Sequence, residues 1–350
     1  MVDIKSMDFG MLQDFVGQLG EKPFRAKQLY FWMHQQLATD FEQMTNLPLS
    51  FREQLREKCI LTSVSIQEEQ CSARDGTRKF LMRLNDGNMV ESVLMKYHHG
   101  NSVCISSQVG CRMGCRFCAS TVGGLVRSLE PSEMLDQIYE ISRHIGERVS
   151  NIIIMGIGEP LDNFDNVVRF IRMISEEKGL HISQRNITLS TCGLVPQIYQ
   201  LMEEELAITL AISLHAPNDG LRRRMMPVAE RFSIKEIMEA CKEYMKRTGR
   251  RVTFEYTLVE GTNDTAEHAG QLCRLLHQMG RDGMKCHVNL IPLNSVKGRL
   301  GQRSAPKNVQ DFKFVLEKNR INVTIRREMG SDIDAACGQL RNKNKGGETT

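Results

Sequence analysis

The strongest constraint on this chain is an alternation of short β-rich apolar runs with amphipathic helical segments, from about residue 103 onward. The strand candidates are residues 103–106, 151–155, 186–190, 207–213, 252–259, 286–291 and 322–326. Between them, apolar residues recur at helical spacing, as in 134–145 and 167–174. Strands that alternate with helices predict a parallel sheet, and six or seven such units in about 230 residues favour an incomplete (β/α) barrel. In such a barrel the reactive groups gather at the carboxyl ends of the strands.

The first hundred residues follow two other patterns. Apolar residues recur at helical spacing between Met11 and Met33, which predicts a small helical domain whose aromatic side chains are mainly core. A period of two then follows, with Asp-Gly pairs at 75–76 and 86–87, which predicts β-hairpins. We therefore predict an α/β chain, a partial (β/α)6 barrel with an N-terminal helical accessory domain and a β-hairpin extension. The expected boundaries are 1–60 for the accessory domain, 61–100 for the hairpin connecting region, 101–340 for the barrel and 341–350 for a polar tail.

Composition narrows the function classes. With 41% hydrophobic and 25% charged residues, the chain of 350 residues is typical of a soluble globular protein. It has no apolar run of about 18 residues and no secretory signal pattern, so we expect no membrane span and a cytoplasmic location. In a reducing compartment the 11 cysteines predict metal binding or thiol chemistry rather than a disulfide framework. The formal charge of +4 permits a nucleic-acid partner without requiring one.

Three cysteines lie close together directly after the first barrel strand. Cys111, Cys115 and Cys118 form a Cys-x3-Cys-x2-Cys triplet on a loop that contains glycine. A [4Fe-4S] cluster normally takes four thiolates, so three would leave one iron open to a small-molecule ligand. A structural zinc site closes with four ligands, and Cys104 is the candidate for the fourth.

Polar residues and glycines follow several of the other predicted strands. Because these positions are equivalent in a barrel, they predict a cofactor that lies across the strand ends. The candidate cofactor-binding residues are Gly158, Glu159, Ser190, Ser213, Leu214, His215 and Asn294.

These motifs together resemble those of a known family. The triplet is similar to the signature of radical S-adenosylmethionine enzymes, in which the open iron is chelated by S-adenosylmethionine and an electron from the cluster cleaves it to a 5'-deoxyadenosyl radical. Over essentially the whole chain the sequence resembles the RlmN/Cfr family of RNA adenine methyltransferases, and most of all its RlmN branch. The segments that carry the resemblance are residues 104–111, 111–118, 158–161, 213–217, 289–294 and 332–340.

The resemblance implies a reaction and its partners. The product is 2-methyladenosine in 23S rRNA, near the peptidyl-transferase centre, and in tRNA next to the anticodon. Two S-adenosylmethionine molecules are used per turnover: the first methylates a cysteine, and the second supplies the radical that removes hydrogen from that S-methyl group. The resulting carbon radical adds to C2 of the adenine. A flavodoxin-type reductant and a monomeric enzyme are also expected.

The resemblance also implies roles for individual residues. Cys337 matches the methyl carrier, and Cys104 matches the thiol that resolves the protein–RNA thioether and leaves a transient disulfide. Glu91 matches the base that takes the C2 proton. The N-terminal helical domain is expected to bind RNA, together with basic residues such as Arg222, Arg223 and Arg224.

Two alternatives stay open at this stage. A Cfr-type reaction would methylate C8 of the same rRNA adenine, and the pocket geometry that decides between the two carbons is not visible in a sequence. A more distant alternative is a non-enzymatic zinc-binding RNA protein that uses Cys104 with the triplet.

Overall fold

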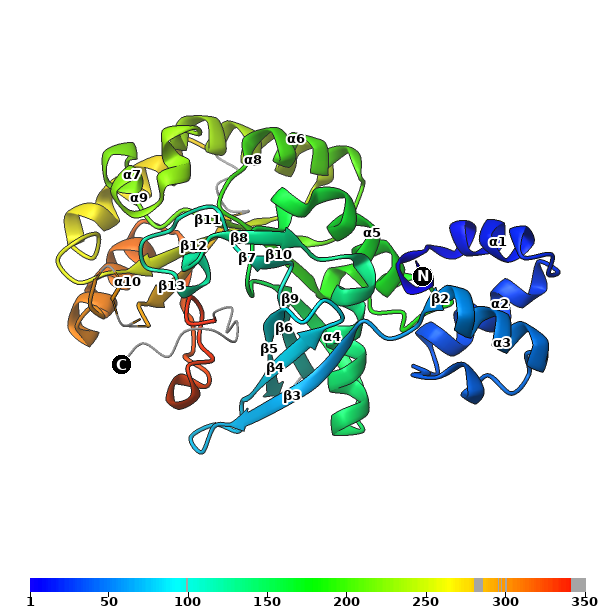
Figure 1. The fold of residues 1–350 in the computed structure, drawn as a ribbon. Helices are drawn as coiled ribbons and strands as arrows, with labels where there is room; N and C mark the ends of the chain where they lie inside the picture. The colour runs from blue at the N-terminus through cyan, green and yellow to red at the C-terminus, as the bar shows by residue number, and fades with distance from the viewer. Residues whose placement is uncertain (99, 280–285, 295, 297, 300, 341–350) are drawn as a thin grey trace.

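A curved sheet of ten strands organises the molecule (Figure 1). The computed structural model describes residues 1–98, 100–279, 286–294, 296, 298–299 and 301–340. The predicted tail at 341–350 lies outside the described residues. Within the described ranges the strand order is β14-β13-β12-β11-β10-β9-β6-β5-β4-β3. No helix in these ranges is long and apolar enough to cross a membrane.

Neighbouring strands from β6 to β14 pair in parallel, as the alternation of strands and helices predicts. These strands are β6 (Gly100–Ile105), β9 (Val149–Ile154), β10 (Ile187–Thr191), β11 (Thr209–Ser213), β12 (Val252–Leu258), β13 (Cys286–Pro292) and β14 (Asn322–Ile325). The helices between them are α4 (Pro131–Ile145), α5 (Phe164–Ser175), α6 (Val195–Glu203), α7 (Asp219–Met225), α8 (Ile234–Thr248), α9 (Ala266–His277) and α10 (Pro306–Lys318). The predicted partial (β/α)6 barrel is confirmed, with the helices along the outside of the sheet (Figure 1).

Helix α4 has clear end signals in its sequence. Helix α4 starts with Pro131 behind a capping box formed by Glu130 and Glu133, and it ends at Gly146, whose φ of 66° is left-handed. Its buried face contains Met134 and Ile138, which pack into the main core. The helix is therefore fixed by end signals and by an apolar stripe together.

An antiparallel meander extends the barrel sheet at the edge of β6. It consists of β3 (Val64–Cys71), β4 (Arg78–Leu84) and β5 (Met89–Tyr97), which match the predicted hairpins. Strand β5 pairs antiparallel with β6, and the register places Val93 beside Cys104. Phe80, Met82 and Val103 belong to one apolar core, so residues 64–97 share the core of the barrel.

The N-terminal helices form a unit with a core of its own. They are α1 (Phe9–Gln18), α2 (Phe24–His34) and α3 (Leu49–Lys58), with the short parallel strands β1 (Val2–Asp3) and β2 (Cys59–Ile60). The prediction that the aromatic residues here are core holds for Tyr30, which is buried. It is wrong for Phe24, which is 51% exposed because it lies on the outer face of α2.

Buried polar contacts join this unit to α4. Lys5 Nζ lies 2.6 Å from Asp136 Oδ1, and both side chains are almost completely buried. Asp136 Oδ2 also accepts a hydrogen bond from the backbone N–H of Ser63 at 2.7 Å, and His34 Nδ1 lies 2.9 Å from the Tyr139 hydroxyl. Separating a buried ion pair leaves an unpaired charge, so these contacts hold the N-terminal unit in a fixed position against the barrel.

Candidate active site

The three clustered cysteines lie on a loop whose two ends are joined. Strand β7 (Gln108–Gly110) pairs antiparallel with β8 (Leu125–Ser128), and the Cys111 N–H donates to the Gly124 carbonyl at 3.0 Å. Gly110 has a φ of 75°, and a Cβ there would lie 2.0 Å from the Gly124 oxygen. Only glycine fits this position, so the two ends of loop 111–124 lie in direct contact. Strands β7 and β8 are not predictable from the sequence, because strands of three and four residues carry too little periodicity.

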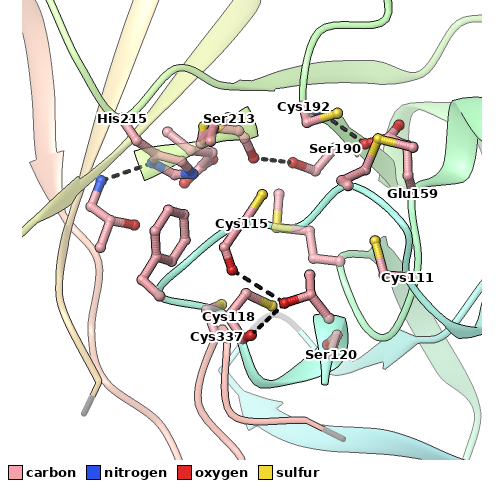
Figure 2. A pocket seen from close by; sticks show the side chains of 18 of the residues that line it. Cys111, Cys115, Cys118, Ser120, Glu159, Ser190, Cys192, Ser213, His215 and Cys337 are labelled. Carbon is pink, nitrogen blue, oxygen red and sulfur yellow. Dashed lines mark hydrogen bonds between the residues drawn. The ribbon is translucent and has the colours of Figure 1, made fainter. Parts of the chain in front are cut away.

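The three thiols face a cavity of about 940 Å³ at the carboxyl ends of the barrel strands (Figure 2). Figure 2 shows the cysteines and Cys337 on one side, with Ser190, Ser213 and His215 opposite them. The sequence-predicted residues that line the cavity are Cys111, Cys115, Cys118, Gly158, Glu159, Ser190, Ser213, His215, Asn294 and Cys337.

The electrostatics of the three thiols suit an iron–sulfur cluster. Burial raises the pKa of Cys111 to about 12, and the charge of Glu159 and of the neighbouring thiolates adds to this. Burial and the charges of Cys118 and Cys111 likewise raise the pKa of Cys115. Thiolates crowded together in this way are unfavourable unless a cation offsets their charge, and iron would do so. Within the described ranges no three metal-binding side chains converge closely enough for a single ion, and a cluster does not need this because each thiolate binds a different iron.

Glu159 connects the ends of two strands. Its Oε1 accepts from the Leu161 N–H at 3.0 Å, and its Oε2 accepts from the Cys192 N–H at 2.8 Å. Burial raises the pKa of this carboxyl group, while the backbone donors lower it. Gly158, next to it, has a φ of 111°, and a Cβ there would lie 2.7 Å from Gln108 Cβ. Glu159 also accepts from the side chains of Thr191 and Cys192, so it holds the ends of β9 and β10 together, and because it lines the cavity its carboxylate can attract an ammonium group.

A row of polar side chains crosses the barrel at one level. Ser190 Oγ lies 3.4 Å from Ser213 Oγ, and the strand register places Ser213 beside Glu255 and Glu255 beside Asn289. Asn289 Nδ2 donates to Glu255 Oε1 at 2.9 Å. Glu255 Oε2 has no hydrogen-bond partner among the described residues, although the side chain is only 3% exposed and lines the cavity. A buried acceptor without a donor favours a ligand that supplies one.

The protonation of His215 follows from one contact. The Thr257 backbone N–H donates to His215 Nδ1 at 3.0 Å, so Nδ1 is the acceptor and Nε2 bears the proton. Burial, together with the charge of Arg222, lowers the pKa of His215 to about 3. His215 is therefore a neutral donor at physiological pH, with its ring edge-on to Phe117 at 5.1 Å.

Two interpretations from the sequence need correction. The side chain of Leu214 does not line the cavity but is fully buried in the main core, because it points to the opposite side from its neighbours Ser213 and His215. Arg222 is not an RNA contact: its side chain is fully buried and donates to the Cys192 carbonyl at 2.6 Å and to the Leu214 carbonyl at 3.2 Å. Arg222 therefore joins the ends of β10 and β11 behind the cavity.

A second cavity, of about 580 Å³, adjoins the first. It contains Cys104, and its wall shares Met155, Asn294, Arg326 and Cys337 with the first cavity. Burial and the charge of Cys337 raise the pKa of Cys104 to about 12, whereas the charge of Arg326 lowers it. All 11 cysteines are free thiols, so the disulfide that the resemblance implies is not present. Cys337 thus lies where the two cavities meet.

Glu255 is a cavity residue that the sequence does not single out, and Arg326, which the sequence suggests only as a basic residue for RNA, also lines the cavity. Arg326 Nη1 lies 3.3 Å from Met155 Sδ and 3.9 Å from Glu255 Oε2. Both residues line the cavity of the three thiols. The register aligns Glu255 with Asn289 and Asn289 with Thr324, so Arg326 follows two residues beyond the level of Glu255, and this proximity becomes visible only once the strand pairing is known.

Glu91 lies on β5 and is 1% exposed. It forms an ion pair with Lys79 at 3.8 Å. Because side chains alternate along a strand, Glu91 faces the same side of β5 as Val93 and Met95, which line the second cavity. Glu91 is thus on the Cys104 side of the sheet, although it does not itself line either cavity.

Comparison with known proteins gives consistent matches. The model of the radical SAM superfamily matches residues 105–273, and the model of the ribosomal RNA large subunit methyltransferase N-terminal domain matches residues 2–61. Proteins named "Probable dual-specificity RNA methyltransferase RlmN" from Lachnospira eligens and Lachnoclostridium phytofermentans are 59% and 61% identical, covering 98% and 97% of this chain and 97% and 94% of theirs. The crystal structure of a radical SAM methyltransferase from Sphaerobacter thermophilus is 40% identical, with a TM-score of 0.92 over 97% of this chain and 99% of that chain.

Proposed function

This chain belongs to the RlmN family of radical S-adenosylmethionine RNA methyltransferases, and on that premise we propose that it methylates C2 of adenine in both 23S rRNA and tRNA. Its cofactors are a [4Fe-4S] cluster and S-adenosylmethionine. The relatives bear the name of the RlmN branch, so the Cfr-type reaction and the zinc-binding alternative are both set aside.

One observation carries the proposal. Cys337 lines the same cavity as Cys111, Cys115 and Cys118 and also the adjoining cavity that contains Cys104. A cysteine that carries a methyl group must reach both the cofactor and a resolving thiol. This position supports Cys337 as the carrier and Cys104 as the resolving thiol.

The protein residues then have distinct tasks. C2 of adenine is electron-poor and does not attack a sulfonium methyl group, so the thiolate of Cys337 takes the methyl first, as a far better nucleophile. When bound, the cluster and a second S-adenosylmethionine supply a 5'-deoxyadenosyl radical that takes hydrogen from this S-methyl group. The family resemblance assigns to Glu91 the task of accepting the C2 proton once the carbon is joined to the base, and its position on the Cys104 side of the sheet, next to the residues that line the second cavity, supports this. The thiolate of Cys104 then attacks Cys337 Sγ, so that a disulfide forms and the bond from Cys337 Sγ to carbon breaks. The released carbon takes up a proton to become the methyl group, and the unpaired electron of the adduct would return to the cluster when it is bound.

The cavity residues bind and orient the cofactor in this proposal. Glu159 offers carboxylate oxygens to the ammonium group of S-adenosylmethionine, and Ser190 and Ser213 offer hydroxyls to its ribose. Asn294 Oδ1 is buried without a partner among the described residues, so it can accept from an amino group. His215 donates through Nε2. Loop 111–124, whose two ends are joined by β7 and β8, supplies the three thiolates.

The position of the methyl group tests the proposed function. RNA from a strain that lacks this gene should contain no 2-methyladenosine at the rRNA and tRNA sites, and expression of the chain should restore it at both. Mass spectrometry of digested RNA distinguishes C2 from C8 methylation. Restoration of 8-methyladenosine alone, or no methylation of either RNA, would contradict the proposal.

The outer face of α2 is the RNA contact that we propose for the N-terminal domain. Phe24 and Phe31 are 51% and 39% exposed, and exposed Lys27 lies between them on the same face. The Arg25 guanidinium lies 4.7 Å from the centre of the Phe24 ring. Aromatic rings alternating with cations are the groups that stack on unpaired bases and contact phosphates.

A double variant tests this surface. Lys27→Ala/Phe31→Ala should weaken RNA binding about tenfold and reduce its salt dependence, because a stacking partner and a phosphate contact are both lost. The matched control is Lys313→Ala/Phe314→Ala on α10, where Phe314 is 64% exposed. Binding measured by fluorescence anisotropy over a salt series should change little in the control. Equal effects of both double variants would exclude a specific role for α2.

The remaining partners belong to the same proposal. We expect a monomer in the cytoplasm, where its RNA substrates are, and a flavodoxin-type reductant. Turnover with reduced flavodoxin in place of a chemical reductant tests the electron donor, and size-exclusion chromatography with light scattering tests the oligomeric state.

A further inference from the structure

The loop that contains Cys337 is attached to the turn between β3 and β4. We call residues 330–340 the carrier loop and residues 72–77 the β3–β4 turn. They are about 255 residues apart in the chain, yet several hydrogen bonds join them. In Figure 1 the red C-terminal loop lies beside the tip of this hairpin. The β3–β4 hairpin therefore holds the loop that contains Cys337, a role that the reaction chemistry alone does not assign to it.

Asp75 uses its two carboxylate oxygens for two different segments. Oδ1 accepts from the Thr77 N–H at 2.9 Å, which shapes the turn itself. Oδ2 accepts from the Gly330 N–H at 2.9 Å, which fixes the start of the carrier loop. Although burial raises the pKa of Asp75, these hydrogen bonds lower it below its ordinary value, so the residue is a carboxylate with both oxygens in use.

Asp332 makes the reciprocal contact from the carrier loop. Its Oδ1 accepts from the Ser72 hydroxyl at 2.7 Å, and its Oδ2 accepts from the Ala73 N–H at 3.0 Å. Each segment therefore offers a carboxylate to backbone or hydroxyl donors of the other. Charge-assisted hydrogen bonds of this kind are stronger and more directional than neutral ones.

A side chain would not fit at Gly330, the first residue of the carrier loop. Gly330 has a φ of 64°, and a Cβ there would lie 2.7 Å from Ala335 Cβ and 2.9 Å from Thr77 Cγ2. The turn and the loop are thus in close contact at this point. Glycine is needed both for the left-handed backbone and for this approach.

The far end of the carrier loop is attached beside the cluster loop. The Ala119 N–H donates to the Gly338 carbonyl at 2.8 Å, and the Ser120 hydroxyl donates to the Leu340 carbonyl at 2.8 Å. Asn294 Nδ2 donates to the Cys337 carbonyl at 3.2 Å. Cys337 therefore lies between one attachment on the hairpin and another on the loop of the three thiols.

We propose that Asp75 and Asp332 are positioning residues, which hold the carrier loop so that Cys337 faces the cofactor cavity. This inference rests on the proposed function, because it assigns a role to the carrier loop in that reaction. Without the β3–β4 attachment, the loop keeps its contacts beside the cluster loop, the contact of Lys79 with the Asp334 carbonyl and the packing of Ala335 and Leu340, but its start is released and Cys337 samples more orientations. The 5'-deoxyadenosyl radical would then form without a correctly placed S-methyl group nearby. S-adenosylmethionine would be cleaved to 5'-deoxyadenosine without methylation of the RNA.

Asp75→Asn tests the inference with a minimal change. The amide has one acceptor oxygen, so it can serve Thr77 or Gly330 but not both, and its NH2 group faces the other donor. We expect the ratio of 5'-deoxyadenosine to methylated adenosine to rise about tenfold. In the holoenzyme, amide hydrogen exchange of residues 330–340 should accelerate about tenfold, while exchange in α1–α3 stays unchanged. Asp332→Ala should have the same two effects.

Glu68→Gln is the matched control. This exposed carboxylate lies on β3 and contacts Gln70 of the same strand at 2.6 Å, so the same chemical change occurs in the same hairpin without touching the carrier loop. It should leave both measurements unchanged. A wild-type product ratio and wild-type exchange in Asp75→Asn would overturn the inference, and a merely unfolded variant is recognised because it loses cleavage and product together. If wild-type protein forms no methylated adenosine, the proposed function fails instead.

Discussion

Cys337→Ala should form no methylated adenosine while it still cleaves S-adenosylmethionine to 5'-deoxyadenosine. Alanine has no nucleophile to accept the methyl group, so product formation should fall by at least about three orders of magnitude. The three thiols of loop 111–124 are untouched by this change, and Cys337 lies in the wall between the two cavities rather than on the cluster loop. Cluster assembly and reductive cleavage should therefore persist. Quantifying both nucleosides by liquid chromatography and mass spectrometry in one reaction gives the answer.

The control for this experiment is Cys71→Ala. Cys71 is an exposed free thiol at the end of β3 and lines neither cavity, so its loss should leave product formation near the wild-type level. Methylation that persists in Cys337→Ala would remove this residue as the carrier. Loss of 5'-deoxyadenosine as well would point to a damaged cluster rather than to a missing carrier.

Cys104→Ala should be purified with RNA attached to it through a covalent bond. In the proposed reaction the carbon that becomes the methyl group is joined to both the base and Cys337 before Cys104 attacks. Without the second thiol this thioether has no resolving nucleophile, so the enzyme should stop after a single turnover. Cys104 is 7% exposed and lies in the adjoining cavity with Cys337, the position that such an attack requires. A denaturing gel should show a slower band that disappears after ribonuclease treatment.

The double variant Cys104→Ala/Cys337→Ala separates this adduct from ordinary tight binding. It lacks the carrier, so it should bind RNA but form no covalent adduct. Repeated turnover of Cys104→Ala without an adduct would exclude Cys104 as the resolving thiol. An adduct that also forms in the double variant would show that the link does not pass through Cys337.

The barrel could be predicted from the sequence because local periodicity and tertiary structure agree there. The predicted strand 252–259 matches β12 (Val252–Leu258), and the stripe 134–145 lies within α4 (Pro131–Ile145). Each of these segments has enough residues to show its period, and their end signals agree with it. The three thiols could be predicted for another reason: cysteines at this spacing are rare unless they bind a metal cluster.

The rest depended on register and on burial, which a single sequence does not display. Leu214 sits between two cavity residues, but side chains near the strand end alternate, so it faces the core. Arg222 belongs to a basic run that would ordinarily be solvated, yet it is buried among backbone carbonyls. Glu255 lines the cavity because the register places it between Ser213 and Asn289. The strand register decides the position of Glu255, and burial decides those of Leu214 and Arg222.

The buried ion pair of Lys5 and Asp136 has a consequence for how substrate must approach. Because the N-terminal unit is fixed to α4, the proposed RNA surface on α2 cannot swing toward the cavity to meet a base. The distance between the proposed RNA surface on α2 and the cofactor cavity is therefore fixed by the fold. The deformation needed to insert an adenine falls on the nucleic acid, which favours RNAs whose target nucleotide is already easy to extrude.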